Sequence, residues 1–274
     1  MFKSKKIVFI LALILTTPLV VKSQGVGVYN GLTKTRDVSI GQSYSNVIVL
    51  KNSGTEPEEV RLYQTDFHFT ADGQKFFAKP GQSTRSNSSW ITFSPSRLTV
   101  PPSTLAEIKV HIQVPDDPVL CGTYWSMIMV EIVPKITQDI DSLKKHDIQF
   151  GINQVMRYGV QIISNINNSG TRDINFLDTK VIEEQGSKIL EVDVENTGER
   201  WLRPYLWVDL YSSDGHYIGK FEGGRWRIFP GTSVRFRVDL TTVPEGKYNA
   251  LVVVDNKDEY IFGAQYALNL ENTY

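Results

Sequence analysis

The chain has 274 residues, of which 41% are hydrophobic and 22% charged, and its 29 basic and 30 acidic side chains nearly cancel. This is the composition of an ordinary globular protein, long enough for one large or two small domains, and it excludes disordered, collagen-like and coiled-coil chains. The balanced charge offers no positive field for nucleic acid, and a single cysteine excludes a disulfide framework or a multi-cysteine zinc site.

The first 23 residues have the pattern of a cleaved signal peptide. Lys3, Lys5 and Lys6 precede an apolar run at 7–15, and cleavage is expected after Ser23. The run is shorter than the roughly 20 apolar residues that span a membrane, so no transmembrane segment is expected after cleavage. Four lysines leave with the signal peptide, and the exported chain has 29 − 4 = 25 basic and 30 acidic residues, a net charge of −5. We expect an exported protein, either periplasmic or at the cell surface or extracellular.

Alternating apolar and polar residues predict β-strands through the exported chain. The alternation is clear at 107–113, 190–195 and 234–240, and a period of two is typical of half-buried strands. Asp-Gly turns at 72–73 and 214–215 lie between the predicted strands, as antiparallel β-sandwiches require. The sequence therefore predicts an all-β protein.

Short motifs recur in the same order in the two halves of the chain. An Asn-x-Gly turn, an Asp-Gly turn, a proline-led strand and a Gly-x-Tyr turn begin at residues 52, 72, 102 and 122, and again at 196, 214, 230 and 246. The repetition indicates one antiparallel sandwich used twice, although β-rich segments also resemble one another by chance. A polar run at 164–170 places the boundary, so the predicted domains are 24–163 and 164–274.

No catalytic or metal-binding pattern is present. The four histidines lie far apart, at positions 68, 111, 146 and 216, without the spacing of metal ligands. Cys121 could act as a nucleophile only beside a histidine that folding brings near, and a structural thiol is the simpler interpretation. We therefore expect a non-enzymatic binding protein without a metal or cofactor.

Aromatic side chains crowd into the predicted second domain. If the apolar residues within 206–210 face the core, Tyr205, Trp207 and Tyr211 share the opposite face. Exposed, this stripe and Trp226 would form a surface that binds protein or carbohydrate. Covered by the hairpin that carries Trp226, the same residues would be ordinary packing.

A long alternating stretch precedes the predicted boundary. Its apolar face carries Ile148, Phe150, Ile152, Met156, Tyr158, Val160 and Ile162, interrupted by Gln154. Fifteen extended residues span roughly 50 Å, far more than a common strand of five or six residues. Such a strand can overhang its sheet and pair with a strand of another protein. The ordinary alternative is a last strand of the first domain, bent at Gln154 and fully paired inside it.

Several stretches resemble the PapD-like periplasmic pilus chaperones. They are Thr35-Arg36, 47–52, 90–95, 98–102, 130–134 and 156–160, in that family's order over nearly the whole exported chain. The resemblance implies two immunoglobulin-like domains and a pilus or other surface-protein subunit as partner. In that family an arginine of the first strand and a lysine of the long strand hold the subunit's terminal carboxylate. Arg36 stands at the first position, and Arg157 lies near the second.

A second set of motifs is similar to the WxL-interacting cell-surface proteins. These motifs are 122–125 with 127–131, and 243–248. This resemblance implies the same two sandwiches but peptidoglycan, glycan or a surface protein as the ligand. The candidate partner-binding residues are Arg36, Ile148, Phe150, Ile152, Met156, Arg157, Tyr158 and Val160, and the alternative aromatic surface is Tyr205, Trp207, Tyr211 and Trp226.

Overall fold

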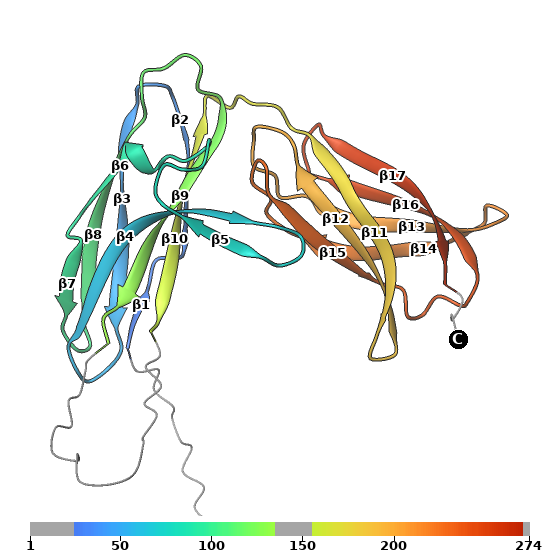
Figure 1. Cartoon of the computed structure of the whole chain (residues 1–274), viewed down its shortest axis with the longest axis horizontal. Coiled ribbons are helices and arrows are strands. Elements are labelled where there is room, and N and C mark those ends of the chain that lie inside the picture. Colours follow the sequence, from blue (N-terminus) through green and yellow to red (C-terminus); the bar gives the residue numbers. More distant parts are fainter. Residues whose placement is uncertain (1–24, 135–154, 271–274) are drawn as a thin grey trace, which may run out of the picture.

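The structure is a computed structural model that describes residues 25–134 and 155–270, and it contains two β-sandwiches (Figure 1). The predicted signal peptide and the candidate residues Ile148, Phe150 and Ile152 lie outside the described residues. Within the described ranges, no helix has the length and hydropathy needed to span a membrane. The prediction of two all-β, immunoglobulin-like domains is confirmed.

The first sandwich packs a four-stranded sheet, in the order β1-β3-β8-β6, against a sheet in the order β2-β10-β9-β4-β5, with β7 also paired to β4. Its elements are β1 (Val26–Val28), β2 (Thr33–Val38), β3 (Ser43–Asn52), β4 (Glu58–Phe69), β5 (Lys75–Ala78), a 3-10 turn (Ser88–Trp90), β6 (Ile91–Ser94), β7 (Arg97–Val100), β8 (Leu105–Gln113), β9 (Gly122–Ile132) and β10 (Arg157–Ile166). The alternation predicted at 107–113 is confirmed, because Ile108, Val110 and Ile112 are fully buried between the sheets.

The second sandwich packs the three-stranded sheet β11-β12-β15 against the four-stranded sheet β14-β13-β16-β17. Its strands are β11 (Ile174–Glu184), β12 (Ser187–Asn196), β13 (Tyr205–Ser212), β14 (Tyr217–Arg225), β15 (Ser233–Asp239), β16 (Lys247–Asp255) and β17 (Ile261–Asn269). Leu190, Val192 and Phe236 lie in its core, as the alternation predicts.

The predicted repeat is confirmed in detail at the Asn-x-Gly turns. Asn52 donates from Nδ2 to the carbonyls of Glu56 and Val100, and its Oδ1 accepts from the Gly54 N–H. Asn196 makes the same three bonds with Arg200, Ile228 and Gly198. Because each asparagine is fully buried and joins one turn to a distant strand, the same polar device stabilises both sandwiches.

Two details differ from the prediction. The pairing of β2 with β10 is parallel, whereas a purely antiparallel sandwich was expected. The reason is the path of the chain. β1 pairs with β3 in one sheet, and the chain then crosses to the opposite sheet, where β2 pairs with β10. In addition, β10 continues to Ile166 in the core of the first sandwich, so residues 164–166 belong to that sandwich and not to the second.

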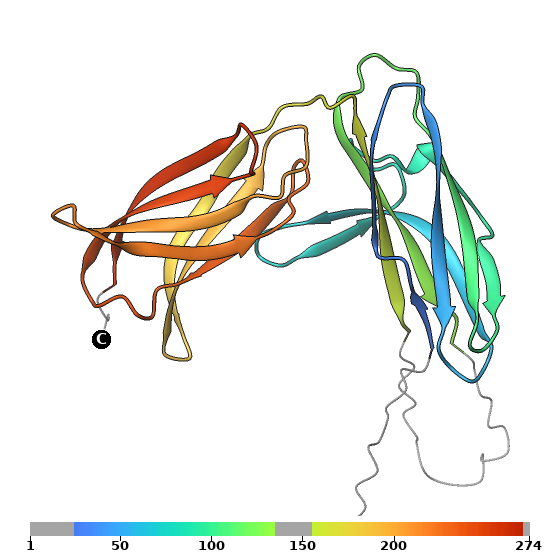
Figure 2. The ribbon, with the colours of Figure 1, turned by 180° about the vertical axis from the view of Figure 1, so that it is seen from behind.

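The two sandwiches meet at one end of the first, and the β4–β5 hairpin extends toward the second in both views (Figures 1 and 2). At the hairpin tip, the Ala71 N–H donates to Ser233 Oγ at 2.9 Å. An aromatic cluster lies behind it, in which Phe229 stacks on Trp125 with ring centroids 4.8 Å apart and also contacts Phe69.

Candidate partner-binding site

The strand β10 is paired on both sides over only part of its length. Its ten residues, Arg157–Ile166, pair with β9 along one side. On the other side β2 pairs only with residues 161–166. In the described residues no strand lies beside Arg157–Val160 on that side, so these four residues form a free sheet edge, called here the β10 edge. The stretch at 148–162 is described from residue 155 on, so the choice between an overhanging strand and one bent at Gln154 and fully paired stays open.

The orientation of the backbone identifies the groups that the β10 edge offers. The Met156 carbonyl accepts from the Ile132 N–H of the neighbouring segment, whereas the Gln161 N–H donates to Leu32 on the β2 side. Backbone groups in an antiparallel pair alternate in direction from one residue to the next. The N–H and C=O groups of Arg157 and Gly159 therefore point away from β9, toward the open side. They can form backbone hydrogen bonds with an added strand.

A hollow lies beside the β10 edge, where β1 departs to the other sheet. Its volume is about 270 Å³, and Val28, Ile132, Met156 and Tyr158 contribute to its walls. Met156 is 46% exposed and Tyr158 is half-buried against the core. Both side chains therefore border the hollow beside the edge, and their contact with a partner stays a prediction. The side chain of Val160 is fully buried in the core, and its inclusion among the partner-contacting side chains is corrected.

Arg157 takes part in an ion-pair network on the outer face of the sheet. One carboxylate oxygen of Glu131 pairs with Arg157 Nε, and the other pairs with a guanidinium nitrogen of Arg61, each at 2.6 Å. Tyr63 also donates to this carboxylate, at 3.3 Å. Desolvation raises the pKa of Glu131, but the hydrogen bonds and charges of the two arginines outweigh it, so the pKa is lowered. Glu131 is therefore a buried anion at neutral pH.

Arg36 and Arg157 are not brought together. Arg36 lies on β2 opposite Ser164, seven residues along β10 from Arg157, a separation of about 23 Å along a strand. Its guanidinium lies over the ring of Tyr44, 5.3 Å from the centroid. One terminal carboxylate cannot bind both arginines at that separation, so the resemblance-based expectation of a shared carboxylate site does not hold for this pair.

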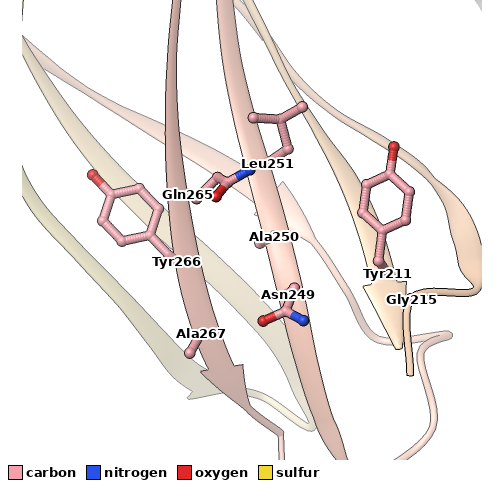
Figure 3. A pocket seen from close by; sticks show the side chains of 8 residues that line it. All are labelled: Tyr211, Gly215, Asn249, Ala250, Leu251, Gln265, Tyr266 and Ala267. Atoms are coloured by element: carbon pink, nitrogen blue, oxygen red, sulfur yellow. The ribbon is translucent and has the colours of Figure 1, made fainter. Parts of the chain in front are cut away.

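The aromatic stripe of the second sandwich lies on the outer face of β13, as predicted, while Leu206, Val208 and Leu210 are buried. Lys220 Nζ covers Trp207 at 4.0 Å from the ring centroid, so the stripe is partly covered by its own sheet. Beside it, Tyr211, Asn249, Leu251 and Gln265 border a shallow hollow of about 510 Å³ (Figure 3).

Trp226 does not belong to this stripe. It is 55% exposed and lines a separate hollow, of about 380 Å³, with Phe67 and Phe69 of the β4–β5 hairpin. The four aromatic residues of the alternative surface therefore do not form one surface. The structure also brings no three metal-ligating His, Cys, Asp or Glu side chains together within residues 25–134 and 155–270.

The contact between the sandwiches was missed by sequence reasoning. Glu199 provides much of it: its carbonyl accepts from the Thr123 N–H at 2.8 Å, and its carboxylate lies 3.1 Å from Arg85. No motif marks Glu199. No motif marks the burial of Phe229 in this contact either.

No protein-family model and no curated protein matches the sequence. Among solved structures, the chain is similar to one from the chaperone–tip adhesin complex of CFA/I fimbriae, with 13% identity over 89% of this chain and 98% of that chain and a TM-score of 0.46. It is also similar to the class 5 fimbriae chaperone CfaA, with 12% identity, 88% and 98% coverage and a TM-score of 0.46. For the E. coli chaperone DraB the identity is 10%, the coverage 89% and 98%, and the TM-score 0.40.

These structures belong to the group of proteins that the sequence resembles, the PapD-like chaperones. The resemblance to the WxL-interacting proteins, with its peptidoglycan or glycan ligand, has no support among them. At these identities the likeness concerns the fold, and the binding function is argued from the residues of this chain.

Proposed function

We propose that this protein is exported and binds a segment of another envelope protein by strand addition at the β10 edge, as a non-enzymatic chaperone does for a surface subunit. One observation carries the proposal: the backbone groups of Arg157 and Gly159 face an open side beside a hollow. The N-terminal charged and apolar pattern supports export, and a pilus subunit in the periplasm is the partner that the family resemblance suggests.

Strand addition gives each part of the site a role. An added segment forms hydrogen bonds with the N–H and C=O groups of Arg157 and Gly159, which supply affinity without reading sequence. Met156 and the half-buried Tyr158 border the hollow and contact alternate side chains of the segment, which fixes its register. Burial of apolar surface there adds to affinity, at about 25 cal/mol per Å² before the costs of association.

The sharpest test removes one open-side donor and keeps the rest of the strand. Arg157→Pro deletes the Arg157 N–H, which β9 does not use, at the first residue of the strand, where proline is tolerated. Arg157→Ala is the matched control, since it removes the same ion pair but keeps the N–H. The measurement is quantitative co-purification of envelope proteins with the tagged mature chain, expressed in its native host.

We expect wild type to retain one protein, and Arg157→Pro to retain about fivefold less of it, or still less, than Arg157→Ala. This difference is the effect of one backbone hydrogen bond and the strand geometry around it. Met156→Asp should reduce the same protein further, with little change in thermal unfolding because Met156 is exposed. Equal retention by the proline and alanine variants would contradict strand addition at this edge.

A further inference from the structure

A second hollow lies on the outer face of the same sheet, next to the β10 edge. Its volume is about 450 Å³. Met127 and Met129 of β9 form its floor, and Tyr63 and Phe67 of β4, Phe77 of β5 and Gly159 of β10 border it. We call these six residues the methionine groove. The register places them on one face, because Tyr63 is paired with Met129 and Gly159 lies opposite Met129 on the other side.

The floor of this groove is unusually apolar for the outer face of a sandwich. Met127 and Met129 are each only 7% exposed although they point away from the core, and Phe77 is 57% exposed at the rim. Methionine is flexible and polarizable, and its sulfur makes favourable contacts with aromatic rings. An apolar floor with an exposed aromatic rim is suited to receive a large apolar side chain.

Gly159 connects the methionine groove to the β10 edge. A Cβ at this position would lie 2.9 Å from Met127 Sδ and 3.4 Å from Met129 Sδ, so the two sulfurs fill the space of the missing side chain. Residues directly opposite each other on neighbouring strands have Cβ atoms about 5 Å apart on the same face. A residue of an added strand opposite Gly159 therefore faces the sulfurs, with no intervening side chain on β10.

The charges around the groove favour an acidic segment. The charged groups facing it are Arg157 and Lys75 at its border and the neighbouring Arg61 and Glu131. Glu131 is the one carboxylate of this set and already pairs with both arginines. Lys75 is the first residue of β5, and its side chain is exposed. The set has three cations and one anion, which leaves two positive charges for a partner to complement.

We infer that the partner is an extended acidic segment of another protein, with an aromatic side chain opposite Gly159 that enters the methionine groove. This rests on the proposed function and specifies the chemistry of its ligand. The backbone hydrogen bonds hold the segment, and the aromatic side chain fixes its register. Carboxylates two residues before and two residues after the aromatic residue lie on the same face and meet Lys75 and the arginines. A segment with a small polar residue at that position makes the same hydrogen bonds but leaves the groove empty.

The test uses synthetic peptides as the probe. Each is a labelled 12-residue strand of alternating threonine and valine with one central guest residue (Trp, Leu or Ser). Either two aspartates or two lysines stand two positions before and two positions after the guest, so that they lie on the same face of the strand. Affinity for the mature full-length chain is measured by fluorescence anisotropy. We expect the Trp–Asp peptide to bind about tenfold more tightly than the Ser–Asp peptide and than the Trp–Lys peptide.

Protein variants locate the effect. Met127→Ala with Phe77→Ala should remove the preference for Trp over Ser, and Lys75→Glu should reduce the preference for Asp over Lys by at least about threefold. Lys247→Glu, on the second sandwich, is the charge-matched control and should leave both preferences unchanged. Replacing the Trp guest with benzoylphenylalanine should give a photo-crosslink to Met127 or Met129.

The outcomes separate the two proposals. Equal binding of Trp and Ser peptides, or no binding of any peptide, would overturn the inference about the groove. If all peptides bind alike and every one of them binds more weakly to Arg157→Pro than to Arg157→Ala, strand addition stands and the groove inference fails. If the Trp preference persists while Arg157→Pro and Arg157→Ala bind every peptide equally, the groove binds side chains without strand addition and the proposed function fails.

Discussion

The same Asn-x-Gly turn occurs in both sandwiches, but the two copies differ in the contacts around them. In the first, the turn at Asn52–Gly54 closes the end of the sandwich near Gly25, and its hydrogen bonds with the residues that the structure describes stay within that domain. In the second, the turn at Asn196–Gly198 makes the same internal bonds, and the residues that follow it reach the first sandwich. The buried asparagine stabilises the fold of its own sandwich, and the partly buried residues after the second turn make the contact between the sandwiches.

The segments to which the two asparagines donate differ in the same way: one stays within its own domain, and the other contacts the neighbouring sandwich. Val100-Pro101-Pro102 in the first sandwich corresponds to Ile228-Phe229-Pro230 in the second, since Thr104 and Thr232 donate to the carbonyls of Pro101 and Phe229. Pro101 is exposed, whereas Phe229 is 1% exposed and stacks on Trp125 of the other sandwich. A repeated domain thus acquires a contact with its neighbour by substitutions at positions that its own fold leaves free.

The largest expected effect comes from Phe229→Ala compared with Pro101→Ala. Removing Phe229 empties the centre of the aromatic cluster, and Phe→Ala at a buried site costs about 3–5 kcal/mol. The proline substitution at the exposed equivalent position should cost less than about 0.5 kcal/mol. Differential scanning calorimetry measures both, and small-angle X-ray scattering should show that only Phe229→Ala loosens the arrangement of the sandwiches. Similar unfolding curves for both variants would contradict the comparison.

Asn52→Ala and Asn196→Ala should be nearly equal in effect, about 3 kcal/mol each. Each substitution removes three hydrogen bonds and leaves buried carbonyls unpaired, at a cost of about 1–3 kcal/mol per group. Urea unfolding followed by hydrogen exchange assigns each loss to its own sandwich. A tolerated substitution at either position would show that the two turns are not equivalent.

Gly198→Ala should cost about 2 kcal/mol, more than Gly54→Ala, which should cost less than about 1 kcal/mol. A Cβ at Gly198 would lie 2.7 Å from backbone atoms of Thr171 and Asp173, in the connection between the sandwiches. At Gly54 the nearest atoms are 3.2 Å and 3.3 Å away, so a small adjustment suffices. Chemical denaturation of both variants tests the order, and a larger loss at Gly54 would reverse it.

The smallest effect is a pH dependence confined to the junction. The Thr171 N–H, then the Cys121 thiol and Arg85, lower the pKa of Glu199 below its ordinary 4.5. A lowered folded-state pKa stabilises the protein above the unfolded-state value, and that contribution is lost as the pH falls below about 4.5 through the folded pKa. With its side chain 38% exposed, Glu199 should contribute less than about 1 kcal/mol.

Glu199→Gln is the test of that pH dependence, because it removes the charge of the carboxylate. In the first sandwich the equivalent position is Thr55, which carries no charge. The difference in stability between wild type and Glu199→Gln should shrink as the pH falls from 6 to 3. A constant difference across this range would mean that the carboxylate charge has no part in the contact.

Local patterns in the sequence predicted what depends on local chemistry. The alternation on β8 and β13 identified the buried faces, and the repeated Asn-x-Gly motif identified the two sandwiches. These features follow from side-chain period and turn geometry within a few residues. The crossing of the chain from β1 to β2 was not predictable in this way, because it depends on which distant strand has a free edge.

The candidate site was predictable only in part for the same reason. Alternation at Met156 and Tyr158 predicted a strand but left open whether its edge is free. It also could not tell that Val160 is buried or that Arg36 lies far from Arg157. The methionine groove had a signal that could have been used. The unbroken apolar run at 127–130 is typical of a strand covered on both faces, and so indicated contacts outside the core.

Cys121 lies where the two sandwiches touch, with its Sγ 3.3 Å from a carboxylate oxygen of Glu199, and it is the one cysteine of the chain. Desolvation and the nearby carboxylate raise the pKa of its thiol, which keeps the reactive thiolate scarce while the contact is closed. Separation of the sandwiches removes both influences at once. The rate at which an alkylating reagent modifies Cys121 in the unaltered protein therefore reports how often the two sandwiches separate, and no label has to be introduced.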